Sequence, residues 1–457
     1  MKDFLKVGVS GVRGVVGDSL TPQIAAAFAR AFAASVGQGS VVVGRDTRPS
    51  GYALERAVTV GLQSAGCKPL LAGIVPTPTV CLVVPELGAR GGIAITASHN
   101  AARWNALKFI GPDGLFLPKQ QADELADIYH QGNFPLVTEE NMPSAVTLDN
   151  PLATHFRRIL GYVDAAAIRR RHFKVAVDCC NGVGALHTRR FLEAELGASV
   201  VTCFDQPSGA FEREPEPLPQ NLTRLSALVR EQSCDIGFAQ DPDGDRLAIV
   251  DEQGRPIGED LTVAFAVRQV LDRHQRGPVA IHLATSRSVQ CVAEDRGSQV
   301  TRTRIGEINV VQAMQSIGAV VGGEGNGGVI IPAIHPCRDS YAAMAVVLEL
   351  MVAEKKTVSE LYAEVPRYYM AKDKLKAQGE SISRVLRQLR QRHQHQRLTL
   401  FDGVHVELDD QWFHARASNT EPVIRLCAEA RTADEAEQLC RALRAELEND
   451  LANPHTP

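Results

Sequence analysis

The sequence lacks the features that would direct it to a membrane or to nucleic acid. It contains no unbroken apolar run of membrane-spanning length, which takes about 20 residues. Lys and Arg number 49 against 53 Asp and Glu, a net charge of -4, so no overall basic field attracts a phosphate backbone. We therefore expect neither a membrane partner nor a nucleic-acid partner. An anionic ligand would have to be bound by local cations.

Paired cysteine motifs and targeting segments are also missing. The 10 cysteines are scattered without a Cys-x-x-Cys pair, and the adjacent Cys179 and Cys180 lie in an apolar run. This pattern is typical of reduced, buried thiols. Residues 1–6 are too polar and too few for a signal peptide. The default interpretation is a cytoplasmic enzyme.

The length of the chain and its alternation of strand-like and helix-like segments indicate a multidomain α/β protein. At 457 residues it is several times longer than an average domain. From Val41 onward, β-branched runs alternate with stretches of helical spacing, including one helical stretch over 340–364, and this alternation favours layered α/β units. Beyond Pro366 the pattern changes to that of a small α+β unit. Composition shifts then predict domains at 1–150, 151–255, 256–365 and 366–457.

One polar loop places carboxylates at alternate positions, at Asp241, Asp243 and Asp245. Oxygen ligands in a tight turn suit a hard cation such as Mg²⁺. An EF-hand is excluded, because Arg246 stands where that loop requires Gly and strand-like segments flank it. A metal site is the favoured interpretation, and an acidic turn is the alternative.

A second polar loop, Thr96 to Asn100, follows a strand-like run of small residues at 91–95. Ser98 within it is a candidate nucleophile, although a serine in this setting often caps a helix or forms a turn. The sequence has no Gly-x-Ser-x-Gly elbow, and no His and Asp are spaced as a hydrolase triad. The serine loop alone therefore leaves nucleophile and turn open.

Two further loops could bind a polyol phosphate. The first, Arg416-Ala417-Ser418-Asn419-Thr420, offers a guanidinium, hydroxyls and an amide to an oxyanion, with an ordinary polar turn as the alternative. The second, 322–328, matches Gly-x-Gly-x-x-Gly, but a strand-like run follows it where a dinucleotide site needs a helix. Glu324 and Asn326 in that loop suit hydrogen bonds to a sugar, with a plain glycine turn as the alternative.

Together and in this order, the loops resemble the α-D-phosphohexomutase superfamily of phosphoglucomutases, phosphomannomutases and phosphoglucosamine mutases. The segments Ser10 to Gly14 and Gly44 to Arg48 fit as well, so the match spans nearly the whole chain. The resemblance implies four domains around a central cleft, of which three share a mixed-sheet α/β plan and the C-terminal one is a small α+β domain. It also implies an isomerase, an intramolecular phosphotransferase that works through a hexose 1,6-bisphosphate.

The resemblance assigns a role to each candidate residue. Ser98 would be the phosphoserine, and Ser98 with the aspartates would surround one Mg²⁺. The catalytic residues would be Ser98, Lys108, Arg13 and His99. The metal ligands would be Ser98, Asp241, Asp243 and Asp245. The sugar phosphate would be bound by Arg246, Glu324, Asn326, Arg416, Ser418, Asn419 and Thr420.

The identity of the sugar rests on finer features. The run Trp104 to Lys108 and the glycine-rich sugar loop look most like phosphoglucosamine mutases, so glucosamine 6-phosphate is the favoured substrate. A phosphomannomutase or phosphoglucomutase is the alternative, and a sugar phosphatase or a non-catalytic sugar-phosphate binding protein is a remote one. Ala101, Glu307, Asn326 and Gly328 depart from the commonest bacterial pattern, which leaves the sugar and the general acid and base open.

Overall fold

The computed structural model describes residues 5–8, 11–377, 379–418 and 422–453. Ser10, Asn419 and Thr420, which the sequence analysis singles out, lie outside these ranges.

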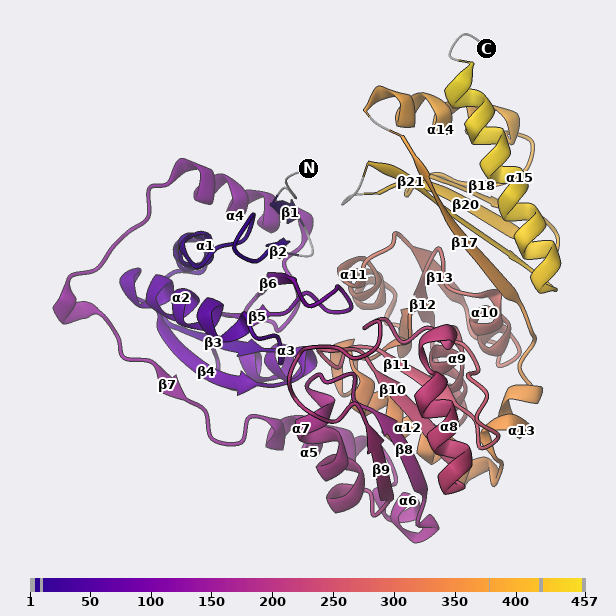
Figure 1. Cartoon of the computed structure of the whole chain (residues 1–457), viewed down its shortest axis with the longest axis horizontal. Helices are drawn as coiled ribbons and strands as arrows, with labels where there is room; N and C mark the ends of the chain where they lie inside the picture. The colour runs from indigo at the N-terminus through magenta and orange to yellow at the C-terminus, as the bar shows by residue number, and fades with distance from the viewer. Residues whose placement is uncertain (1–4, 9–10, 378, 419–421, 454–457) are drawn as a thin grey trace.

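Among the described residues, four β-sheets follow one another along the chain, each layered with helices (Figure 1). The predicted α/β plan with a C-terminal α+β unit is confirmed. We call the four parts the first unit (5–147), the second unit (152–250), the third unit (260–363) and the fourth unit (369–452).

The first unit carries a mixed sheet with strand order β1-β2-β6-β5-β3-β4-β7. The parallel strands β3, β4 and β5 lie beside one another, and β6 joins them antiparallel. Strand β5 ends directly before the serine loop, so the sheet presents that loop at its edge. The strands are β1 Lys6–Gly8, β2 Gly11–Val15, β3 Ser40–Arg45, β4 Lys68–Ile74, β5 Gly91–Ile95, β6 Trp104–Ile110 and β7 Val146–Thr147. The helices are α1 Pro22–Val36, α2 Gly51–Ser64, α3 Thr77–Glu86 and α4 Lys119–Gln131.

The second unit has strand order β11-β10-β8-β9, with β10 parallel to β8 and antiparallel to β11. The aspartate loop connects β10 to β11, so the predicted strands on both sides of it are confirmed. The strands are β8 Lys174–Asp178, β9 Ser199–Cys203, β10 Ile236–Gln240 and β11 Leu247–Val250. The helices are α5 Leu152–Tyr162, α6 Ala165–Arg171, α7 Gly184–Arg190 with a π-helical turn Phe191–Glu195, and α8 Thr223–Gln232.

The third unit has strand order β13-β12-β14-β15-β16, and the sugar loop connects the antiparallel strands β14 and β15. The strands are β12 Val279–His282, β13 Val300–Thr303, β14 Val321–Glu324, β15 Gly328–Ile331 and β16 His335–Arg338. The helices are α9 Asp260–Gln269 with a π-helical turn Val270–His274, α10 Arg287–Glu294, α11 Glu307–Ile317, α12 Ser340–Glu354 and α13 Val358–Ala363.

The predicted helical stretch over 340–364 is helical except for a short break, which divides it into two helices. Lys355 takes a left-handed conformation with φ 56°, which ends α12. Thr357 then begins α13 with a capping box, in which its hydroxyl accepts from the backbone N–H of Glu360. A local cap therefore overrides the continuous helical pattern.

The fourth unit is an antiparallel sheet of order β17-β21-β20-β19-β18 covered by α14 and α15. Strand β17 was not predicted, because Lys and Asp fill four of its last five positions, without strand-like alternation, at an edge of the sheet. The strands are β17 Tyr369–Lys376, β18 Arg397–Thr399, β19 Val404–Glu407, β20 Trp412–Ala417 and β21 Val423–Ala430. The helices are α14 Glu380–Arg392 and α15 Ala433–Ala452.

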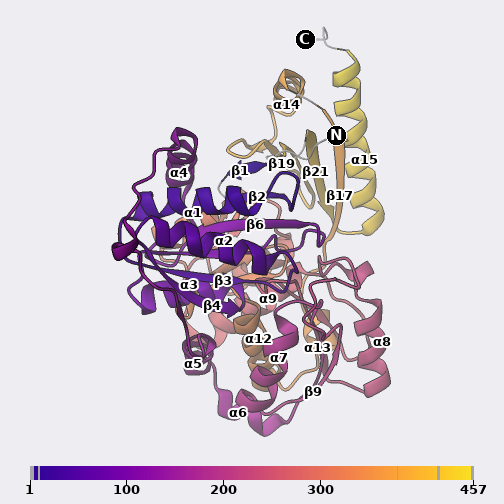
Figure 2. The same cartoon turned by 60° about the vertical axis from the view of Figure 1, so that its left-hand side comes forward.

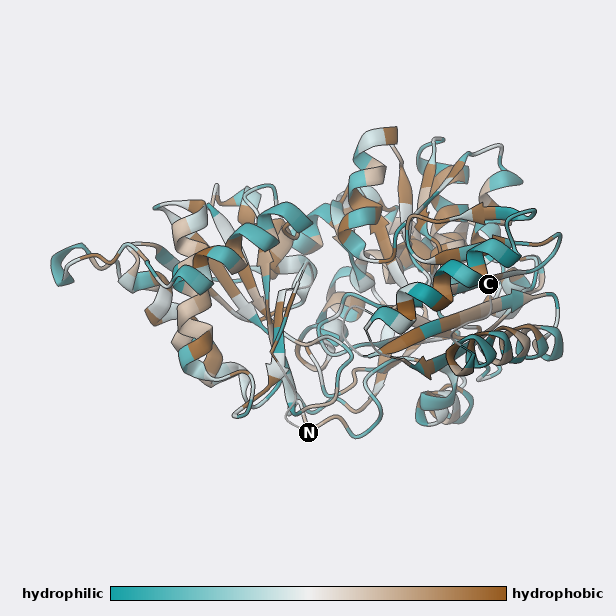
Figure 3. Cartoon of the chain, turned by 90° about the horizontal axis from the view of Figure 1, so that it is seen from above, coloured by the Kyte–Doolittle hydropathy of each residue, from teal (hydrophilic) through white to brown (hydrophobic). Residues whose placement is uncertain are grey.

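Apolar packing divides the molecule unequally. One continuous buried cluster links side chains of the first, second and third units, whereas the fourth unit has a core of its own. Figure 3 shows the fourth unit's helices with hydrophilic outer faces over more hydrophobic strands. In Figures 1 and 2 this unit lies at one end of the molecule, beyond the third unit. No helix of the described residues has the length and apolar character to cross a membrane.

Polar contacts connect the fourth unit to the third. The Asp402 carboxylate accepts from the backbone N–H of Ile305 at 2.9 Å. Glu429 on β21 accepts from the Arg287 N–H at 3.0 Å and caps the start of α10. Ser288 donates to the carbonyl of Pro366 in the connecting segment at 2.8 Å. These contacts hold the two units together through hydrogen bonds.

Candidate active site

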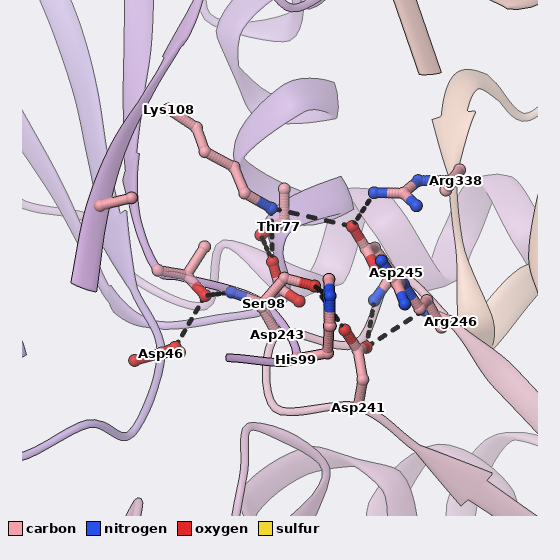
Figure 4. A network of polar contacts seen from close by, with 12 residues as sticks. Asp46, Thr77, Ser98, His99, Lys108, Asp241, Asp243, Asp245, Arg246 and Arg338 are labelled. Atoms are coloured by element: carbon pink, nitrogen blue, oxygen red, sulfur yellow. Dashed lines mark hydrogen bonds and ion pairs between the residues drawn. The ribbon is translucent and has the colours of Figure 1, made fainter. Parts of the chain in front are cut away.

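Ser98 stands buried at the centre of the site, with 4% of its surface exposed (Figure 4). Its Oγ donates to Asp241 Oδ2 at 2.8 Å, although the two residues are separated by 143 positions in the chain. Its backbone is left-handed, with φ 48°, a conformation that costs a non-glycine residue about 1–3 kcal/mol. Neighbouring contacts must therefore hold this hydroxyl in place.

Those contacts come from a buried ion pair between Asp46 and Arg48, with Arg48 Nε 2.9 Å from Asp46 Oδ2. The Arg48 guanidinium donates to the backbone carbonyls of Ser98, Asn100 and Ala101, at 2.5, 2.8 and 3.0 Å. The sequence analysis noted the turn that contains this pair but gave it no role. The structure shows that it fixes the backbone of the serine loop.

The aspartate loop forms a compact, buried group of oxygen ligands. Asp241, Asp243 and Asp245 each offer a carboxylate oxygen, and these oxygens all lie within 4.8 Å of one another. Asp243 Oδ1 and Asp245 Oδ1 accept no hydrogen bond from any described residue. Buried carboxylate oxygens without donors fit a hard divalent cation, because it would supply the missing positive charge. The group could therefore hold a metal ion.

The pKa values of Asp241 and Asp243 shift in opposite directions. Burial, and then the charges of Asp245 and Asp243, raise the pKa of Asp241 well above its ordinary value. Burial also acts to raise the pKa of Asp243, but Lys108 and the hydrogen bonds around it hold that pKa below its ordinary value. Lys108 Nζ lies 2.8 Å from Asp243 Oδ2 and 3.8 Å from Asp245 Oδ2, as Figure 4 shows. A predicted catalytic lysine thus reaches the predicted metal loop.

Arg338 connects the aspartate loop to the sugar loop, and the sequence analysis missed it. Its guanidinium contacts three buried carboxylates, at 2.5 Å from Asp245 Oδ2, 2.6 Å from Glu324 Oε2 and 3.0 Å from Glu307 Oε2. Its signal in the sequence is slight, a single arginine at the end of a strand before the Asp339 helix cap. Glu307, one of the positions that depart from the common pattern, serves here as a partner of this arginine.

A histidine and an arginine lie beside the serine loop. The His99 ring Nδ1 lies 3.4 Å from Ser98 Oγ. Arg13 Nη1 donates to Asn100 Oδ1 at 2.7 Å. Burial, followed by the charges of Arg246 and Arg13, lowers the pKa of His99 well below its ordinary value. The neutral imidazole therefore sits among fixed guanidinium charges beside the serine.

The sugar loop requires its glycines. A Cβ on Gly325 would lie 2.3 Å from Asp260 Oδ1, and one on Gly327 would lie 2.2 Å from the Leu247 carbonyl oxygen. Burial acts to raise the pKa of Glu324, but Arg338 overrides it and lowers that pKa to about 2. Glu324 is therefore an anion at neutral pH, and Asn326 Nδ2 donates to it at 3.3 Å.

A cavity of about 570 Å³ lies between the sugar loop and the fourth unit. The predicted residues Asn326 and Arg416 both line it, so the structure brings together a sugar-loop residue and a phosphate-loop residue. The backbone N–H of Ser418 donates to the Val423 carbonyl at 3.0 Å. The cavity is also lined by Glu216, His282, Lys372, Lys374 and Arg425.

Comparison with known proteins was made by sequence and by structure. Four domain models of phosphoglucomutase/phosphomannomutase, for the α/β/α domains I, II and III and the C-terminal domain, match residues 5–135, 153–254, 258–369 and 352–446. A probable phosphoglucosamine mutase of Methanopyrus kandleri is 37% identical over 443 residues, covering 96% of each chain. A phosphoglucomutase/phosphomannomutase of Thermococcus kodakarensis is 34% identical over 439 residues, covering 94% of this chain and 96% of the other.

A crystal structure of a phosphoglucomutase/phosphomannomutase family protein from Burkholderia thailandensis superposes with a TM-score of 0.84 at 26% identity. The superposition covers 100% of this chain and 99% of the other. The matches extend over every unit described above, including the loops that form the site. The chain therefore belongs to the phosphoglucomutase/phosphomannomutase family, within the α-D-phosphohexomutase superfamily.

Proposed function

We propose that the protein interconverts hexose 6-phosphate and hexose 1-phosphate through a phosphate carried on Ser98. The observation that supports this most directly is the 2.8 Å contact between Ser98 Oγ and Asp241 Oδ2. It places a buried hydroxyl at the edge of a cluster of carboxylates in which two oxygens, Asp243 Oδ1 and Asp245 Oδ1, accept no hydrogen bond from the described residues. A phosphoryl group there would be surrounded by Lys108, Arg13 and Arg246.

The aspartates would hold one Mg²⁺, the cation that a set of oxygen ligands favours. When bound, it would neutralise charge beside the phosphoryl group. Neutralisation is needed because a phosphoserine adds about -1.5 to -2 charges to the three carboxylates. Lys108 and Arg246 contribute positive charge from opposite sides of the cluster, and phosphoryl transfer depends mainly on such alignment and neutralisation.

In the proposed cycle, a hydroxyl of a bound hexose monophosphate attacks the phosphorus atom on Ser98. The bond from Ser98 Oγ to phosphorus breaks, the attacking hydroxyl loses its proton, Ser98 Oγ takes up a proton, and a hexose 1,6-bisphosphate results. The bisphosphate turns around and returns its other phosphate to Ser98. Arg416 and the sugar loop line one cavity, so they could bind the distal phosphate and the ring in both orientations.

The preferred sugar in this proposal is glucosamine 6-phosphate, with a glucose or mannose phosphate as the alternative. The Methanopyrus kandleri relative supports the first and the Thermococcus kodakarensis relative the second. The serine and aspartate loops are both complete, which argues against a non-catalytic binding protein. The site is buried, which argues against a phosphatase open to water.

A coupled assay tests the substrate directly. Purified protein with Mg²⁺ and a trace of bisphosphate should turn over glucosamine 6-phosphate with the highest kcat/KM in a panel of hexose and hexosamine phosphates. A preference of tenfold corresponds to about 1.4 kcal/mol of transition-state binding. A higher kcat/KM for mannose or glucose phosphate would assign the alternative. Free phosphate released at the rate of turnover would contradict the mutase.

Removing one aspartate should remove the metal-dependent stability. Mg²⁺ at 100 times its Kd should stabilise the wild-type protein against heat by about 2.7 kcal/mol, and Asp241→Asn should abolish this shift. Thermal denaturation in Mg²⁺ or in EDTA, at matched ionic strength, measures it. The control is Asp178→Asn, a buried carboxylate that pairs with Arg213 at 2.8 Å outside the cluster. If Mg²⁺ stabilised Asp241→Asn as much as the wild-type protein, the ion would bind elsewhere.

A further inference from the structure

His282 lies in the sugar site, and no role described so far includes it. It ends strand β12, is 6% exposed, and lines the same cavity as Asn326 and Arg416. A histidine at a strand end in a buried, polar cavity is placed to contact a ligand. The inference that follows rests on the proposed function and specifies how the sugar is bound.

Two hydrogen bonds favour the tautomer of His282 that carries its proton on Nε2. The backbone N–H of Gly325 donates to Thr285 Oγ1 at 3.1 Å, and this hydroxyl oxygen lies 3.1 Å from His282 Nδ1. Among the described residues Nδ1 is the one acceptor in reach of the Thr285 hydroxyl, and we take this hydroxyl as the donor. In a neutral imidazole the proton must then reside on Nε2. Nε2 has no hydrogen-bond partner among the described residues.

The surroundings keep this ring neutral. Burial lowers the pKa of His282 to about 4. It outweighs Glu324 and the ring's hydrogen bond with its own backbone, which both act to raise the pKa, and Arg302 and Lys372 add smaller lowering effects. At neutral pH the ring is therefore an uncharged group with one N–H to donate. Glu324 ends the neighbouring parallel strand β14, one position after Gly323, which pairs with Ile281, and its two carboxylate oxygens already accept from Gly306 N and from Arg338.

We propose that His282 is a specificity-determining residue of the sugar site, whose Nε2–H donates to a hexose hydroxyl beside Glu324. A hydroxyl can donate its hydrogen to Glu324 and accept from His282 at the same time. An ammonium group can donate but cannot accept, so it would leave the His282 N–H without a partner. His282 would thus select a hydroxyl at the ring position it contacts, and an amino group on the substrate would lie at another position.

Three substitutions separate this contact from packing. His282→Phe keeps the ring shape and removes the donor, so kcat/KM should fall about 10- to 100-fold, the effect expected when a polar group in a buried site is left without a partner. The loss should appear chiefly in KM, because the sugar is held in both steps. His282→Gln places an N–H near the Nε2 position and should recover most activity. His282→Asn reaches only the Nδ1 position and should recover less than Gln.

Monodeoxy analogues of the preferred hexose phosphate identify the hydroxyl. For one analogue, wild-type protein and the His282→Phe variant should have equal kcat/KM, since the contact is already missing from the sugar. The control is His187→Phe, a half-buried histidine whose Nε2 donates to the Ile74 carbonyl at 2.8 Å, and it should leave the ranking of sugars unchanged.

The outcomes distinguish the two proposals. If wild-type protein turns over none of the sugar phosphates, the proposed function fails. If it is active and His282→Phe matches it on every sugar, or if His282→Asn equals or exceeds His282→Gln, the assignment of His282 fails and the mutase stands. Thermal melting of each variant shows whether its loss of activity is a loss of folded protein.

Discussion

Ser98→Ala should reduce mutase turnover by at least about four powers of ten, equal to about 5.5 kcal/mol in the activation barrier. The variant has no oxygen to carry the phosphate between the two half-reactions. The fold should remain, because Arg48 holds the loop through backbone carbonyls that the substitution leaves in place.

The assay for this variant needs two measurements. Initial rates with saturating bisphosphate test turnover, and mass spectrometry of the wild-type protein tests whether phosphate resides on Ser98. The control is Ser64→Ala, since Ser64 lies on α2 and donates to the Gly61 carbonyl at 2.9 Å, outside the site. Wild-type rates in Ser98→Ala would reject the phosphoserine.

Arg338→Met should lower the free energy of unfolding by about 3–5 kcal/mol, the usual result of removing one partner from a buried ion pair. Here the loss leaves Asp245, Glu307 and Glu324 without their shared cation, and all three are buried. Arg338→Lys should recover part of the loss, because one ammonium cannot reproduce the planar contacts of a guanidinium. Urea denaturation of the three proteins measures the difference.

The pH dependence of this destabilisation has a defined sign. In the wild-type protein the pKa of Glu324 is lowered from its ordinary value of 4.5 to about 2. The ionised Glu324 therefore adds to the free energy of unfolding above pH 4.5, and this addition is lost as pH falls toward 2. Without Arg338, burial raises that pKa instead, so protonation stabilises the variant. The difference in the free energy of unfolding between the wild-type protein and Arg338→Met should therefore become smaller as pH falls. A difference that is constant from pH 7 to pH 4 would contradict this assignment of the ion pairs.

Local patterns in the sequence predicted what each segment forms more reliably than which segments meet. The aspartate loop between two strands was predicted from its own residues and is confirmed by β10 and β11. The helical stretch over 340–364 was predicted without the break that a capping box makes in it, and β17 was missed because charged residues fill four of its last five positions.

The assembly of the site depends on contacts between distant residues. Arg338 and Asp245 are 93 positions apart, and nothing near either residue in the sequence indicates that they pair. The tautomer of His282 likewise depends on Thr285 and on Gly325, which belongs to another loop. The family resemblance supplied the order of the loops but not these supporting contacts. The roles of Asn419 and Thr420 stay predictions, since both lie outside the described residues.

The separate core of the fourth unit has a mechanical consequence. The cavity has one wall on the third unit and the other on the fourth, and the described contacts between them include the hydrogen bonds of Asp402 and Glu429. Swinging the fourth unit outward would break such polar contacts, which water can replace, and would leave both interiors packed. The first three units would act as a fixed base. The proposed reorientation of a bisphosphate would then require movement of one small part of the molecule.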